Sequence, residues 1–459
     1  MKKINFSFEE KEELKKNAVK YIIPHFASNK EIQKGPKIFV KGEGCYVYDI
    51  EGKKYFDSFA TLLTTVCGHS REEITKVVAE QMNLLEFFPN YVDTFTVPLI
   101  KLAKKLSEIL PGELEVSFFV NSGSEANETA IKMARQYFKE IGESTRYKIM
   151  ARRYSYTGTT LGGVSATGIP WFREYFEPLM PGFIHTVSCW CYHCELGLEP
   201  STCNLSCLKL IEKQIEWEGP KSIAAFITDP IPGSNIGFPV PPDGYIQGLR
   251  KICDKYGILL IFDEVQTGFG KTGKMFACEH WDVVPDIITL GKGLTGGFIP
   301  LGIAVTTQKI AEVFRKPGHE LRSGSTYGGH TVACAATLKN IEIIEKEKLV
   351  ENAKKMGDYI KKKLQNFYNF PIVGDIRGIG LLWAIELVKD KKTKEPLDSK
   401  LAVGSFIRDF CWENGMILRN NGDILVIAPS LIITKEETDM MLEIIEMGIK
   451  EAIKKFNFK

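Results

Sequence analysis

The sequence predicts an α/β fold, with a large domain around a mostly parallel sheet and a small α+β domain built from both chain ends. Between about residues 115 and 305, short apolar segments alternate with helical patterns, which is typical of parallel strands joined by crossover helices. Further strand patterns occur near both chain ends, outside that region. We therefore expect a large domain over residues 66–330 and a small domain over 1–65 and 331–459.

The first elements in chain order belong to the expected small domain. Residues 7–22 form a polar helical pattern with Ser7 as a candidate N-cap. Segments 38–40, 44–49 and 54–57 alternate and bracket Glu51-Gly52, which predicts a hairpin. From about 70 to 110 the apolar residues have helical spacing, which predicts helices before the first strand of the large sheet.

Six apolar segments follow as the predicted strands of the large sheet: 116–120, 148–151, 224–229, 258–263, 287–290 and 303–306. Two helical segments then fill residues 330–365, and strands are expected at 380–387 and 424–428. The last element is an amphipathic helix, 435–455, whose start has the capping-box pattern Thr434-x-x-Glu437.

The composition is that of an ordinary globular protein: 459 residues, 44% hydrophobic, 25% charged, net charge +2. A charge so close to neutral gives no reason to expect nucleic acid or an anionic membrane as a partner, and no apolar segment reaches the roughly 18 residues of a membrane span. The N-terminal sequence MKKINFSFEEKEELKKN lacks the apolar stretch of a secretory signal. The eleven cysteines of the whole chain are then expected to be reduced thiols. The expected location is the cytoplasm.

Lys292 follows the apolar segment 287–290 in the sequence DIITLGKGLTGGFIPLG, at the point where a strand gives way to a glycine-rich loop. Partial burial there would favour the neutral amine, which is a nucleophile for carbonyl carbons. A surface lysine after a strand would show the same pattern. Lys292 alone therefore does not distinguish a nucleophilic lysine from a surface lysine.

Asp263 ends a second buried segment, 258–263, upstream of Lys292. Open α/β sheets place functional groups at this end of a strand. An aspartate facing a pyridine nitrogen would keep that nitrogen protonated, so that the ring is an electron sink, as pyridoxal phosphate (PLP) enzymes require. Together, DEVQTGFGKTG and PDIITLGKGLTGGFIPLG resemble the signature of the class III PLP-dependent aminotransferases.

The resemblance covers nearly the whole chain, from GEGCYVYDIEGKKYFD to IAPSLIITKEETD, and implies the PLP-dependent transferase fold type I. It implies that Lys292 holds PLP as a Schiff base and then moves a proton as general base and acid, while Asp263 keeps the ring protonated. The implied donor is an ω-amino acid, a β-amino acid (a CoA thioester included) or an amine. The implied acceptor is pyruvate or 2-oxoglutarate.

The cofactor's phosphate is expected at NSGSEAN, residues 121–127, which follows a predicted strand and opens a helix. Small residues leave backbone N–H groups exposed at a helix N-terminus, where the dipole favours an anion. A capped helix start would look the same, but the resemblance makes Gly123 and Ser124 phosphate ligands. It also makes Thr326, in GSTYGGH, a ligand of the neighbouring subunit's phosphate, so a homodimer or a dimer of dimers is expected.

The cofactor's ring is expected between two further motifs. Tyr156 matches the aromatic residue that stacks on the ring and Gly158 the glycine that follows, whereas Thr157 stands where the family usually has histidine. The resemblance implies that Val265 packs on the opposite face of the ring and that Gln266 approaches its phenolic oxygen.

The substrate pocket is expected around Arg419, Leu63 and Tyr91. Arg419 resembles the mobile arginine that grips an acceptor carboxylate, and a guanidinium suits bidentate carboxylate binding. Leu63 stands where several amine-accepting relatives carry tryptophan. Asp229 stands where family members more often have glutamate.

Two other interpretations stay open. One is an amino-acid racemase or aminomutase on the same fold, which would share the lysine, the aspartate and the phosphate loop. The other is a metal- or redox-responsive protein that uses the cysteine cluster at 189–207, against which the intact Asp263–Lys292 pair argues. The cluster could ligate zinc or an iron–sulfur centre, but its spacing matches no zinc template closely, so reduced thiols are the default and no metal site is assigned. Its members are Cys189, Cys191, Cys194, Cys203 and Cys207, with His193 between them.

Overall fold

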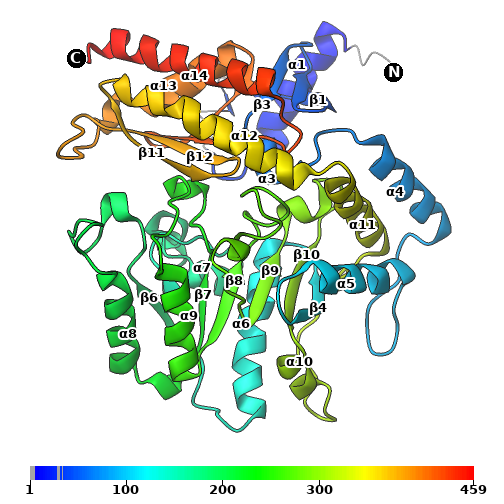
Figure 1. Cartoon of the computed structure of the whole chain (residues 1–459). Helices are drawn as coiled ribbons and strands as arrows, with labels where there is room; N and C mark the ends of the chain where they lie inside the picture. Colours follow the sequence, from blue (N-terminus) through cyan, green and yellow to red (C-terminus); the bar gives the residue numbers. More distant parts are fainter. Residues whose placement is uncertain (1–5, 28–31, 34, 459) are drawn as a thin grey trace.

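Seven strands form the large sheet, in the spatial order β4-β10-β9-β8-β7-β5-β6 (Figure 1). The computed structural model describes residues 6–27, 32–33 and 35–458. From β9 to β6 neighbouring strands are parallel, whereas β10 is antiparallel to both β4 and β9. The prediction of a mostly parallel sheet is therefore confirmed. The strands are β4 (Leu114–Val120), β5 (Lys148–Arg152), β6 (Phe183–Thr186), β7 (Ile223–Thr228), β8 (Leu259–Asp263), β9 (Ile287–Leu290) and β10 (Gly302–Thr307).

This sheet is buried on both faces. In β8, Leu260 and Phe262 belong to one apolar core, whereas Leu259 and Ile261 belong to the core on the other face. Helix α6 packs against β7, β8, β9 and β10. Burial on both faces explains why these strands appear in the sequence as continuous apolar segments. The helices between and beside the strands are α4 (Glu72–Leu84), α5 (Val97–Ile109), α6 (Gly123–Glu140), α7 (Leu161–Ala166), α8 (Ser206–Glu218), α9 (Tyr245–Tyr256) and α10 (Gln308–Phe314).

Two smaller sheets lie above the large sheet in Figure 1. One joins the two ends of the chain, because β3 (Lys54–Asp57) pairs in parallel with β13 (Met416–Ile417). It also contains β1 (Phe39–Glu43) and β2 (Tyr46–Asp49). The other has the order β11-β12-β15-β14, with bounds Val373–Ile379, Leu382–Leu387, Ile424–Ile427 and Arg419–Asn421.

Helices α12 (Leu349–Leu364), α13 (Val403–Glu413) and α14 (Lys435–Phe456) lie around these smaller sheets, at the top of the view in Figure 1. Helix α11 (Thr331–Lys346) packs against α4 and α5 as well as against α12. The limits of a small domain at 65/66 and 330/331 thus stay a prediction, since α11 contacts elements from both predicted domains.

Both predicted helix caps are confirmed. The Thr434 hydroxyl accepts from the Glu437 N–H, and the Glu437 carboxylate accepts from the Thr434 N–H, which forms the capping box of α14. Ser7 caps α1 (Phe8–Tyr21) in the same way. Residues 1–5, the start of the segment judged not to be a secretory signal, lie outside the described residues. None of the helices in the described part of the chain is both long and apolar enough to cross a lipid bilayer.

Candidate active site

The carboxyl ends of the central strands open into a cavity of about 1360 Å³, which segment 417–422 also lines. Most of the predicted site residues line this one cavity, although they come from six separate segments of the chain. They are Leu63, Gly123, Ser124, Tyr156, Gly158, Asp263, Val265, Gln266, Lys292 and Arg419. Asp229 lines it as well.

Lys292 is the first residue of the short helix η7 (Lys292–Thr295), directly after β9. Its φ of +44° is left-handed, a conformation that disfavours a residue with a Cβ by roughly 1–2 kcal/mol. The turn is held from behind by Asn340 of α11, whose side-chain amide donates to the carbonyls of Gly293 and Leu294 at 2.9 and 3.0 Å. Strain that the surrounding structure maintains in this way is typical of functional sites.

Asp263 is held at the end of β8 by two hydrogen bonds. Its Oδ1 accepts from the Val265 N–H at 3.0 Å, and its Oδ2 accepts from the Asn127 side chain at 2.6 Å. Asn127 is itself fixed, since its amide also donates to the Thr157 carbonyl and its oxygen accepts from the Thr289 hydroxyl. This network joins α6, β8 and β9, so the carboxylate has a fixed orientation.

Burial shifts the pKa values of Lys292 and Asp263. The pKa of Lys292 is lowered because burial penalises the ammonium and the Arg419 charge repels it, although the Asp263 carboxylate opposes both effects. The pKa of Asp263 is raised by burial, against the hydrogen bonds from Val265 and Asn127. A lysine with a lowered pKa is a better nucleophile and base near neutral pH.

The start of helix α6 forms a tight cradle. Gly123 begins the helix, and a Cβ there would lie only 2.7 Å from Cγ1 of Val265. Gly158 has a φ of +129°, and its Cβ would lie 2.8 Å from the Ser124 hydroxyl oxygen. The first N–H groups of a helix have no partner within the helix. The cradle therefore presents backbone donors to the cavity at a place where larger residues do not fit.

Arg419 begins β14, and its guanidinium carbon lies 5.4 Å from the centre of the Phe59 ring. The pKa of Arg419 is lowered by burial, which the neighbouring Tyr156 only partly offsets. The Tyr156 ring packs edge-on against Phe172 with 5.0 Å between centroids. One side of the cavity thus combines a cation with aromatic rings.

Leu63 is buried at the end of an unusual turn. All four residues of α3 (Ala60–Leu63) have left-handed φ values, between +42° and +64°, and none of them is glycine. The Asp57 carboxylate holds this turn, because it accepts from the N–H groups of Phe59 and Thr61 and from the Thr61 hydroxyl. The turn places Leu62 and Leu63 on the cavity wall.

Tyr91 and Thr326 do not reach the cavity of their own chain. Both are exposed, and neither is among the residues that line it. They belong to one surface region, since a Cβ at Gly324 would lie 2.9 Å from the Tyr91 hydroxyl oxygen.

Asn127 and Arg152 had no predicted role. Asn127 lies within the quoted motif NSGSEAN, and the signal for it is a polar residue on the buried face of a helix. Arg152 is completely buried; its Nη2 donates to Asp229 Oδ1 at 2.9 Å, and the Ser155 hydroxyl donates to the same oxygen at 2.6 Å. Asp229 Oδ2 is buried without a hydrogen-bond partner among the described residues.

Comparison with known proteins identifies the family. The model of the class III aminotransferases matches residues 27–449. The chain belongs to this family. Putrescine–pyruvate aminotransferase of Pseudomonas aeruginosa is 37% identical over 422 residues, which are 92% of each chain.

Solved structures of ω-transaminases share the fold. The (S)-enantioselective ω-transaminase of Thermomicrobium roseum has a TM-score of 0.94 and 37% identity, over 98% of this aminotransferase and 99% of that chain. The ω-transaminase of Pseudomonas jessenii in complex with PMP has a TM-score of 0.92 and 35% identity, over 96% and 98%. The predicted fold type I is confirmed. These matches give no support to a racemase, an aminomutase or a metal- or redox-responsive protein.

Class III aminotransferases use PLP, and the residues of this aminotransferase fit that cofactor. The N-terminus of α6, with Gly123 against Val265, is a cradle suited to a phosphate. Asp263 is a buried carboxylate of fixed orientation, suited to a ring nitrogen. Lys292 lines the same cavity with a lowered pKa, as an amine that attacks a carbonyl carbon requires.

Replacing Asn127 with alanine should lower both kcat and the affinity for PLP. The change leaves Asp263 Oδ2 and the Thr289 hydroxyl without their partner, and each buried unsatisfied group costs about 1–3 kcal/mol. The measurement is a PLP titration together with steady-state kinetics. Asn352→Ala is the matched control, because Asn352 binds the carbonyls of Leu431 and Ile433, away from the cavity. An equal loss of PLP affinity in both variants would contradict a specific role of Asn127.

Proposed function

We propose that this aminotransferase moves the amino group of a primary amine, an ω-amino acid or a β-amino acid (a CoA thioester included) to pyruvate or 2-oxoglutarate. The observation that carries the proposal is the placement of Lys292 and Asp263 on one cavity, from the ends of adjacent strands. The putrescine–pyruvate relative and the ω-transaminase neighbours support an amine donor and pyruvate as the first pair to test.

Lys292 has two tasks in this proposal. Its neutral amine would hold PLP covalently, and the same Nζ, once free, would act as the base that takes a proton from the substrate carbon and as the acid that returns it. When bound, PLP supplies the electron sink that makes the substrate carbon acidic. Burial helps Lys292 in both tasks, since it keeps the pKa of the amine low.

In this proposal, the other residues that line the cavity position the cofactor and polarise its ring. Asp263, fixed by Asn127, would keep the ring nitrogen protonated, and Val265 and Tyr156 would pack against the ring. Gly123 and Ser124 would bind the phosphate with backbone and hydroxyl donors. Gln266 accepts from the Ser234 N–H at 3.3 Å, so its side-chain NH2 group can donate to the phenolic oxygen.

Arg419 binds the acceptor's carboxylate in this proposal. Burial lowers the pKa of Arg419 because it penalises the charged guanidinium, and a bound carboxylate would stabilise that charge. Hydrogen bonds to charged groups contribute about 1.5–3 kcal/mol each. Arg419→Ala should raise the KM for pyruvate by about 10- to 100-fold, which corresponds to that energy, and should change the KM for a simple amine much less. Equal changes in the two KM values would contradict this role. Arg408→Ala, at another arginine on the cavity wall, is the control.

We infer that the active form is a homodimer or a dimer of dimers. Thr326 and Tyr91 lie together on an exposed surface, where they can complete the phosphate and substrate sites of a second subunit. The cytoplasm is the location we propose, on the basis of the composition and the cysteine content.

The test is a panel of diamines, ω-amino acids and β-amino acids, each with pyruvate or 2-oxoglutarate, in which alanine or glutamate is measured as the product. Turnover with one of these pairs supports the proposal. Interconversion of amino-acid isomers without an acceptor would replace it with an isomerase.

A further inference from the structure

Three polar side chains form a small cluster at the turn that places two leucines on the wall of the active-site cavity. Asp57 is 3% exposed, and its Oδ2 is close to three polar groups. The N–H and the hydroxyl of Thr61 both donate to it at 2.8 Å, and His69 Nε2 lies 3.2 Å away. Because an ionised carboxylate only accepts, the His69 ring is the donor in this pair. Asp57, Thr61 and His69 line the same cavity as Lys292.

The turn Ala60–Leu63 needs such support because its backbone is strained. Its four residues are all left-handed, a conformation that is unfavourable for any residue with a Cβ. Within the turn, the N–H groups of Leu63 and Thr64 donate to the carbonyls of Phe59 and Ala60 at 2.9 and 2.8 Å. Asp57 adds the bonds from the N–H groups of Phe59 and Thr61. Strain that the surrounding structure maintains points to a functional role.

His69 is held in place by a part of the chain outside the turn. Its N–H donates to the Gly44 carbonyl at 2.8 Å, and its carbonyl accepts from the Gly44 N–H at 3.3 Å. A Cβ at Gly42 would lie 2.7 Å from the His69 Cβ, so strand β1 packs directly against the histidine. The His69 ring is therefore a donor of fixed position for the Asp57 carboxylate.

The two leucines depend on the turn for their positions. Leu63 is buried and Leu62 is exposed, and both line the cavity. If the backbone of the turn relaxed, both side chains would leave their present places on the wall. The acceptor side of the cavity depends on the other oxygen, since Asp57 Oδ1 accepts from the N–H of Phe59, whose ring lies against the Arg419 guanidinium. Loss of the His69 ring would affect Oδ2 alone.

We propose that Asp57, Thr61 and His69 are positioning residues that set the donor range of this aminotransferase. They hold the turn so that Leu62 and Leu63 keep the donor side of the cavity narrow, which favours small, unbranched amines over amines with a bulky group on the amino carbon. The cluster acts through the two leucines and not by contact with the donor. The effect on donors rests on the proposed function, whereas the hold on the turn does not.

The experiment compares kcat/KM for propylamine with kcat/KM for 1-phenylethylamine, and measures hydrogen exchange at the amides of Thr61, Leu63 and Thr64. In His69→Ala we expect the ratio of propylamine to 1-phenylethylamine to fall about 10-fold, since a misfit of one methylene group in a hydrophobic pocket changes discrimination by about 10- to 200-fold. The three amides should exchange about 10-fold faster, because a hydrogen bond to a charged group changes an opening equilibrium by at least this factor. The KM for the acceptor should stay the same.

Two further variants test whether the cluster acts through the turn. Thr61→Val keeps the shape of the side chain and removes one hydrogen bond to Asp57 Oδ2, so it should lower the ratio to a similar extent. In the double variant with His69→Ala the two effects should not multiply, because both act on the same oxygen. His69→Gln, whose amide nitrogen can take the place of Nε2, should restore the wild-type ratio.

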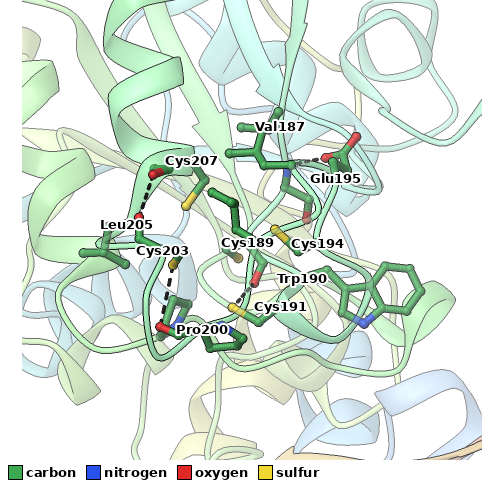
Figure 2. Close-up of a pocket in the computed structure, with 15 residues that line it drawn as sticks. Val187, Cys189, Trp190, Cys191, Cys194, Glu195, Pro200, Cys203, Leu205 and Cys207 are labelled. Atoms are coloured by element: carbon green, nitrogen blue, oxygen red, sulfur yellow. Dashed lines mark hydrogen bonds between the residues drawn. The ribbon is translucent and has the colours of Figure 1, made fainter. Parts of the chain in front are cut away.

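A second histidine–carboxylate pair is the matched control. His193 Nε2 binds Glu386 Oε1, and neither residue is among the described ones that line the active-site cavity. His193 lies between Cys191 and Cys194, in a loop beside a smaller cavity that five free thiols line (Figure 2). In the described part of the chain, no three His, Cys, Asp or Glu side chains are placed to hold a metal ion. His193→Ala should lower the stability and leave the ratio unchanged.

Four results would overturn the proposal: an unchanged ratio in His69→Ala, amide exchange at the turn that stays slow in this variant, an equal change of the ratio in His193→Ala, or multiplied effects in the double variant. The last result would mean that His69 touches the donor itself. Failure of the proposed function is a separate result, since the wild-type protein would then move no amino group from any donor, while hydrogen exchange would still show whether His69 holds the turn.

Discussion

Lys292→Ala should remove the aminotransferase activity, with kcat lowered by at least about 10⁴-fold. The variant loses both the nucleophile for the cofactor and the base that moves the proton, and general base catalysis alone is worth about 10²–10⁴-fold. PLP should still bind through the phosphate cradle, but it should be removed by dialysis, and the visible absorbance of lysine-bound cofactor should be missing. Steady-state kinetics and an absorbance spectrum before and after dialysis measure these effects.

Lys271→Met is the matched control for this variant. Lys271 is also buried, but its ammonium donates to the carbonyls of Ala428 and Pro429, and it does not line the active-site cavity. This variant should lose stability and keep lysine-bound cofactor. If Lys292→Ala retained covalently bound PLP, or kept a tenth of the activity, another residue would have to be the nucleophile.

Asp263→Asn should lower kcat by about 10²–10⁴-fold, the range that proton-transfer groups contribute. An asparagine has nearly the same shape but no negative charge, so it cannot hold the ring nitrogen in its protonated form. The PLP content should change little, because the phosphate cradle and Lys292 are intact. Kinetics at several pH values, together with the PLP content per chain, measure both expectations.

Glu264→Gln is the control for the loss of a buried charge beside this site. Glu264 accepts from the Thr267 hydroxyl in its own turn and from the N–H groups of Ala277 and Cys278 at the start of η6 (Ala277–His280), and it does not line the active-site cavity. That variant should be less stable but should turn over normally once folded. A normal kcat in Asp263→Asn would contradict the role given to this carboxylate.

The central strands of the large sheet, and Asp263 and Lys292 at their ends, could be predicted from the sequence. Strands buried on both faces need apolar residues at every position, and segments 258–263 and 287–290 show this pattern directly, with Asp263 and Lys292 at their ends. The antiparallel direction of β10 could not be predicted, because an apolar strand has the same pattern in either direction. Strand β6 was missed since its sequence, FIHT, is short and only partly apolar.

The supporting groups of the site depend on the fold rather than on local patterns. Asn127 meets Asp263 and Thr289 only because α6 crosses β8 and β9, and residues so far apart in sequence give no local signal. The left-handed turn at Ala60–Leu63 contains no glycine, so the sequence gives no signal for it. Asp57, which precedes the turn, stabilises it. Tyr91 and Thr326 stay predictions, because a single chain places them on its surface.

Lys292 and Asp263 should carry out an amino transfer that proceeds in two separable halves. The most direct test mixes PLP-loaded protein with a ¹⁵N-labelled amine, putrescine first, in the absence of any oxo acid. We expect about one equivalent of carbonyl product per chain, and then ¹⁵N-alanine or ¹⁵N-glutamate once pyruvate or 2-oxoglutarate is added. Release of no carbonyl product by any donor of the panel, or ¹⁵N that never reaches the acceptor, would contradict it.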